Sequence, residues 1–112
     1  MSSELIVLVL TTLGTSADAG WFARTLVEER LAACVNVLPV MRSTYRWKDG
    51  VEQDDERQIV IKTTAERVDA LRARVRQLHP YELPEFIVVQ VADGDHRYLD
   101  WIRDSVSAPD VS

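Results

Sequence analysis

The sequence contains a single cysteine, Cys34, and therefore cannot form an intramolecular disulfide. Long hydrophobic runs are also missing, since the longest, Leu5 to Leu10, is far shorter than the roughly 20 apolar residues of a membrane-spanning helix. The start, Met-Ser-Ser-Glu, lacks the basic segment that opens a secretory signal peptide. We therefore expect a cytoplasmic protein that does not insert into a membrane.

An excess of positive charge is absent as well. The formal net charge is -5, and the 13 Lys and Arg residues are scattered along the 112-residue chain, whereas nucleic-acid-binding domains gather basic residues on one surface. The sequence also has no Gly-rich phosphate loop, no nucleophile elbow and no context for a Ser, His and Asp triad. These gaps argue against a nucleic-acid partner and against an enzyme.

The most informative stretch that is present runs from Leu26 to Trp47, where a helical pattern changes to an alternating one. The helix is predicted from about Ser16 to Ala32, with Thr15 and Asp18 at the spacing of a capping box. The extended arm that follows runs from Cys34 to Trp47, and a bulge or bend is expected near Pro39.

A turn at Lys48-Asp49-Gly50 returns the chain through an acidic segment, residues 52–56, to the apolar Ile59-Val60-Ile61. Arg42 and Arg46 lie opposite this segment, and we interpret the outer hairpin as a solvated ribbon of cross-strand charge pairs. The arm is much longer than the mean strand of about 5 to 6 residues. A small domain cannot cover it, so strand-mediated association with further copies is expected.

Periodicity and turn signals predict the remaining elements. They are a central strand at Glu4 to Thr12, a helix opened by a capping box at Thr63 to Glu66 and ended by His79-Pro80, a strand at Glu85 to Val91, a helix at His96 to Val106, and a frayed tail at Ser107 to Ser112. The order β-α-β-β-α-β plus a terminal helix predicts one α+β domain over residues 1–112. Its expected architecture is a ferredoxin-like sandwich with an antiparallel sheet.

Several motifs, taken together, closely resemble those of the CutA family of divalent-cation tolerance proteins. They are LVEERLAACVNVLP, the Ser43, Tyr45 and Trp47 of S-x-Y-x-W, IKT at Ile61 to Thr63, HPYELPE at His79 to Glu85, and YLDWI at Tyr98 to Ile102. The resemblance implies a homotrimer similar in architecture to the PII signalling proteins, with the long hairpin pairing across subunits. It also implies a non-enzymatic role in tolerance to copper or another divalent cation, with no obligatory cofactor.

Candidate metal ligands are few. Copper favours thiolate and imidazole, and the candidates are Cys34 and His79, with Glu85 near them in the HPYELPE motif. Two alternatives stay open for His79, which could cap a helix end or bind metal, and a buried core position is favoured for Cys34. No CxxC or HxxxH cluster is present, so any metal affinity is expected to be weak.

A second kind of site is an inter-subunit cleft that takes a small ligand. Its candidate residues, in the cleft or at the interface, are Tyr45, Trp47, Lys62, Tyr81 and Trp101. The simpler alternative is that the aromatic side chains only anchor the interface. The corresponding alternative function is a PII-like trimeric sensor or adaptor that also contacts a downstream protein of unidentified class.

Overall fold

The computed structural model describes residues 4–107. In chain order its elements are β1 (Ile6–Gly14), α1 (Ala19–Glu28), β2 (Cys34–Trp47), β3 (Gly50–Thr64), the short 3-10 helix η1 (Ala65–Arg67), α2 (Val68–Leu78), β4 (Ile87–Gln90) and α3 (His96–Val106). None of the described helices is both long and apolar enough to cross a membrane. Most of the predicted tail, residues 108–112, lies outside the described residues.

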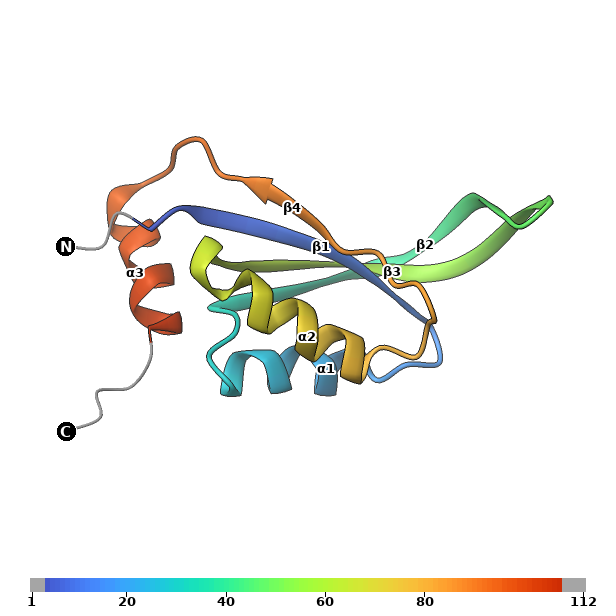
Figure 1. Ribbon diagram of the computed structural model, residues 1–112, viewed down its shortest axis with the longest axis horizontal. Coiled ribbons are helices and arrows are strands. Elements are labelled where there is room, and N and C mark those ends of the chain that lie inside the picture. The colour runs from blue at the N-terminus through green and yellow to red at the C-terminus, as the bar shows by residue number, and fades with distance from the viewer. Residues whose placement is uncertain (1–3, 108–112) are drawn as a thin grey trace.

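The four strands form one antiparallel sheet in the order β2-β3-β1-β4. Helices α1 and α2 lie side by side on one face of it (Figure 1). Alternate strand residues such as Val9 and Ile61 point to this face and are fully buried with Phe22, Leu26 and Leu71 from the helices. The predicted ferredoxin-like fold with a central first strand is confirmed.

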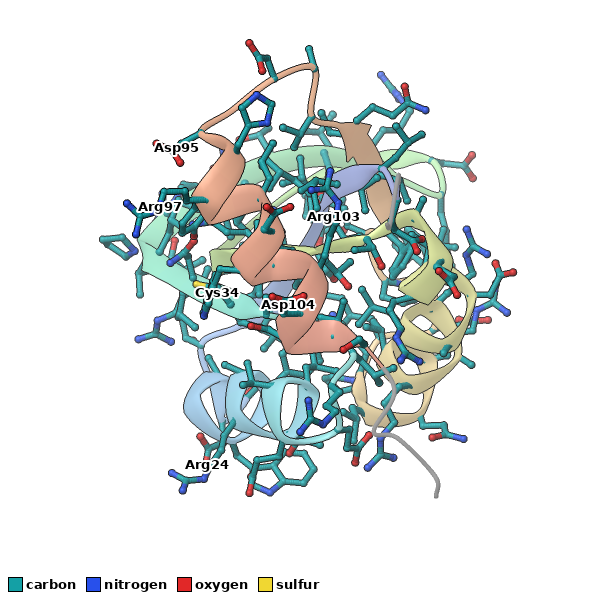
Figure 2. All side chains as sticks on the ribbon, turned by 90° about the vertical axis from the view of Figure 1, so that its left-hand side faces the viewer. Arg24, Cys34, Asp95, Arg97, Arg103 and Asp104 are labelled. Atoms are coloured by element: carbon teal, nitrogen blue, oxygen red, sulfur yellow. The ribbon has the colours of Figure 1, made fainter. Side chains whose placement is uncertain are left out.

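The terminal helix α3 closes one end of the sheet, as Figures 1 and 2 show. Its buried side chains Ile102 and Val106 form a second apolar cluster with Ile6 and Ala33. The face of the sheet opposite to α1 and α2 is not covered beyond this cluster by any described element, and strand residues on it such as Val89 are exposed. We call it the open face.

The β2-β3 hairpin extends well beyond the two helices (Figure 1). Its register shifts between Val37 and Val40, on either side of Pro39, which confirms the predicted bulge. Pairing with β3 nevertheless continues on both sides of the bulge, so β2 is one strand rather than two. Arg42 and Asp55 form one of the predicted cross-strand pairs, with Arg42 Nε and the Asp55 carboxylate 3.2 Å apart.

The predicted bounds of the first helix were wrong. Thr15 does not cap it; the backbone N–H of Trp21 donates to the Asp18 carboxylate at 2.9 Å, so Asp18 is the N-cap and α1 begins at Ala19. The helix ends at Glu28 rather than near Ala32, because Arg30 takes a positive φ of 59° and turns the chain.

The predicted capping box at the second helix was wrong as well. The Thr63 hydroxyl donates to the carbonyl of Leu31 at 2.8 Å, and the backbone N–H of Glu66 donates to the carboxylate of Glu4. The segment therefore starts as η1, and α2 begins only at Val68. The last strand is also shorter than predicted, since pairing with β1 covers only Ile87–Gln90.

Candidate binding pocket

A pocket of about 900 Å³ lies between the outer half of the β2-β3 hairpin, the end of β1 and the connector that follows α2. Its lining includes Gly14 from β1, Tyr45 from β2, Glu56 from β3, and Tyr81 and Glu85 from the connector. The antiparallel register brings these segments together, since Gly14 pairs with Glu56. The pocket therefore has fixed strands on one side and a loop on the other.

His79 fixes that loop to the sheet. Its imidazole is only 7% exposed, and the backbone N–H of Tyr81 donates to its Nδ1 at 3.1 Å. Nδ1 is therefore the acceptor, so Nε2 carries the hydrogen and donates to the carbonyl of Thr12. The centroids of the His79 and Tyr81 rings are also 4.8 Å apart. Both nitrogens of His79 are thus used to hold the loop against β1.

The two tyrosines of the pocket lie in a negative field. The Tyr45 hydroxyl donates to the Asp54 carboxylate, and this hydrogen bond raises the pKa of Tyr45 to about 12. Burial raises the pKa of Tyr81 above its usual value, and the charges of Glu56 and Asp54 raise it further. Acidic side chains of β3 therefore surround both phenols.

Glu56 is the most buried of these acids, with 9% of the residue exposed. Its carboxylate makes no hydrogen bond or ion pair with another side chain among residues 4–107. Glu85 is held differently, because Gln58 Nε2 donates to its carboxylate at 2.9 Å and to the carbonyl of Thr11 at 2.8 Å. Glu85 is thus held by a hydrogen bond, whereas Glu56 is nine-tenths buried as a residue and its carboxylate has no side-chain partner among the described residues.

The three candidate metal ligands do not meet in one subunit. Cys34 pairs with Lys62 near the start of β1, and Figure 2 shows it at the end of the molecule where α3 lies. The pocket with Glu85 is at the other end, roughly 20 Å away along β3 at about 3.3 Å per residue. Cys34 is half-buried, so the predicted core position was only partly right, and its Sγ accepts from Asn36 at 3.7 Å.

No three His, Cys, Asp or Glu side chains within residues 4–107 gather so as to hold a metal ion. An imidazole that ligates copper needs a nitrogen with a free lone pair, and His79 uses both of its nitrogens inside the subunit. The donors among the described residues of one subunit therefore do not fit a resident copper ion.

The structure separates the candidate cleft residues into two groups. Tyr45, Trp47 and Tyr81 all line the pocket. Lys62 and Trp101 are elsewhere. Trp101 is part of α3, with its ring centroid 5.5 Å from that of Tyr98, and Lys62 Nζ donates to the Tyr98 hydroxyl at 3.2 Å.

Interpretation of the sequence missed Asp54 and Glu56 as parts of a site. It treated the acidic segment as a solvated ribbon, yet the register gives it two faces. Ser43 pairs with Asp54 and Met41 with Glu56, so these acids share the face of Tyr45, while Asp55 faces the other way. The alternation was the available signal, but the burial of Glu56 could not be read from it.

Comparisons with known proteins agree on one family. The sequence model described as "CutA1 divalent ion tolerance protein" matches residues 7–105. The chain is 44% identical over 97 residues to the divalent-cation tolerance protein CutA of Thermus thermophilus, covering 87% of this chain and 94% of that relative. It is 48% identical over 81 residues to the human Protein CutA, covering 72% of this chain and 45% of the human protein.

Solved structures show the same architecture. The divalent cation tolerance protein Cut A1 from Thermus thermophilus superimposes with a TM-score of 0.88 at 42% identity, covering 92% of this chain and all (100%) of that chain. CutA1 from Oryza sativa superimposes with a TM-score of 0.89 at 33% identity, covering 95% of this chain and 98% of that one.

Proposed function

This chain belongs to the CutA1 divalent ion tolerance protein family, and on that premise we propose that it acts without catalysis in tolerance to divalent cations, as a cytoplasmic homotrimer. The name of the Thermus thermophilus relative, divalent-cation tolerance protein CutA, supports the process. The observation that carries the assembly is the open face of the sheet together with the long hairpin. Both are surfaces that a single subunit leaves in water.

The open face supports association because it is apolar. Ile87 and Val89 of β4 pair with Leu10 and Leu8 of β1, so their side chains share this face. Ile87 and Val89 are exposed although they are large and hydrophobic. Contiguous apolar surface of this kind marks protein interfaces.

The edges of the sheet offer the second contact. Strands β2 and β4 are the two edges, and an unpaired strand edge readily pairs with another chain. Pairing between the outer hairpin of one subunit and a neighbour would supply partners for backbone groups along the arm. A trimer is the assembly that the likeness to the CutA family implies, and it would cover these edges and the open face.

We propose that each subunit binds copper or zinc only weakly, so that tolerance does not depend on a tight site of its own. Support comes from the two nitrogens of His79, which bond to the carbonyl of Thr12 and the N–H of Tyr81. Further support is that Cys34 pairs with Lys62, six positions along β3 from Glu56, which lines the pocket together with Glu85.

Calorimetric titration tests this metal affinity. Metal-free protein would be titrated with Cu(II), with Cu(I) under reducing conditions, and with Zn(II), using wild type, His79→Ala and His96→Ala. We expect weak heats without saturation in all three proteins. Saturable binding that His79→Ala abolishes and the exposed control His96→Ala retains would contradict the proposal and assign a site to His79.

A second function is supported by the pocket itself. We propose, as the alternative, a PII-like trimeric sensor whose clefts bind a small ligand and whose loops contact a downstream protein. The pocket volume of about 900 Å³ lies within the range of small-molecule sites, and three aromatic residues line it with several carboxylates. A ligand that binds in the absence of metal would favour this function over metal tolerance.

A further inference from the structure

We propose that the pocket beside Glu56 binds a small organic cation that carries aliphatic ammonium groups. The inference rests on the second proposed function, ligand binding in the cleft, and names the chemical class of the ligand. A cation is favoured by the partner that Glu56 lacks, by the charges that line the pocket, and by the aromatic side chains on its walls.

The Glu56 carboxylate lacks a partner within the described residues of its own subunit. The residue is nine-tenths buried and lines the pocket, yet within residues 4–107 its carboxylate has neither a hydrogen-bond donor nor a cation as partner. The oxygens of this carboxylate are not fully enclosed, since Thr11 Oγ1 is the only fully buried side-chain nitrogen or oxygen without a partner among the described residues, so they can be reached from the pocket. A cation that enters the pocket would supply the opposite charge that this largely buried carboxylate lacks.

The second argument is the charge of the lining. The pocket is lined by Asp54 and Asp55 besides Glu56 on β3, and by Glu82 and Glu85 on the connector, and its described lining contains no Lys, Arg or His. Asp55 is paired with Arg42 on the opposite face of the hairpin. The other acidic residues of the lining, Asp54, Glu56, Glu82 and Glu85, form no ion pair among the described residues, and a cleft lined by one sign of charge concentrates ions of the other sign.

The third argument concerns the kind of cation. The carboxylates are too dispersed for a metal site, since no group of three described ligands gathers there. Tyr45, Trp47 and Tyr81 provide aromatic surface on the walls, and ammonium groups bind favourably against such rings. A flexible chain with several ammonium groups reaches separate carboxylates, which a small hydrated ion cannot do. A short polyamine has these properties.

Binding of spermidine, measured by calorimetry at low ionic strength, tests the inference. The proteins compared are wild type, Glu56→Gln and the control Glu28→Gln, which removes the same charge from an exposed position on α1. We expect saturable binding to wild type, a Kd raised about tenfold or more by Glu56→Gln, and a Kd within about twofold of wild type for Glu28→Gln. Adipate, a dianion of similar reach, is the probe of opposite charge.

Four results would overturn the inference. Equal spermidine affinity in all three proteins would mean attraction to the acidic surface in general. Binding of adipate in place of spermidine would reject a cationic ligand but would still support ligand binding in the cleft. Binding of neither probe would contradict the cationic ligand and the ligand-binding function alike. Loss of the trimer mass in Glu56→Gln, without spermidine binding to wild type, would show that a basic side chain of a second copy fills the pocket.

Discussion

Replacing His79 with alanine tests the conclusion that this residue fixes the pocket loop. The substitution removes two hydrogen bonds, one to the buried carbonyl of Thr12 and one from the N–H of Tyr81. A hydrogen bond contributes about 0.5 to 1.5 kcal/mol net, and a buried polar group left unpaired costs about 1 to 3 kcal/mol. We therefore expect His79→Ala to lower the free energy of unfolding by about 2 to 4 kcal/mol.

Urea unfolding at one fixed protein concentration measures this loss, because oligomer stability depends on concentration. His96→Ala is the matched control, since His96 is exposed at the start of α3 and should change stability by no more than about 0.5 kcal/mol. His79→Phe keeps a ring but neither hydrogen bond, and should be nearly as destabilising. A His79→Ala protein as stable as the control would refute the role assigned to His79.

Two further predictions concern local hydrogen bonds. The Asp54 carboxylate raises the pKa of Tyr45 to about 12. The Tyr45–Asp54 hydrogen bond should therefore contribute fully to stability below about pH 10, and this contribution should be lost between about pH 10 and 12. A tyrosinate absorbance titration should show this late step, and Asp54→Asn should shift it to lower pH. Asp18→Ala should destabilise the protein to urea by about 1 kcal/mol, whereas Thr15→Ala, which removes only the wrongly predicted cap, should not.

Hydrophobic periodicity was sufficient to predict the sheet and helices. The continuous apolar run at the start of the chain became the buried β1, and the spacing of Leu71 and Val75 became the inner side of α2. Helix ends were predicted less well, because a cap is chosen by three-dimensional contacts. Thr63 had the right spacing for a cap but lies beside Leu31, whose carbonyl takes its hydroxyl instead.

The site was predicted only in part. Tyr45, Trp47 and Tyr81 were predicted as cleft or interface residues, and they line one pocket, whereas Lys62 and Trp101, predicted with them, do not. Glu56 shares the pocket with the connector that follows α2, and no local pattern in the sequence records such long-range proximity. The same holds for His79, whose partner Thr12 is 67 residues away in the chain.

The mass of a Val89→Arg variant in solution, measured by light scattering, tests the assembly most directly. Val89 lies on the open face and Val27 on α1, and both are 41% exposed, so Val27→Arg adds the same charge at equal exposure. We predict about three times the 12.7 kDa subunit mass for wild type and Val27→Arg, and a shift toward one subunit for Val89→Arg. An unchanged mass in Val89→Arg, or a monomeric wild type, would contradict assembly through the open face.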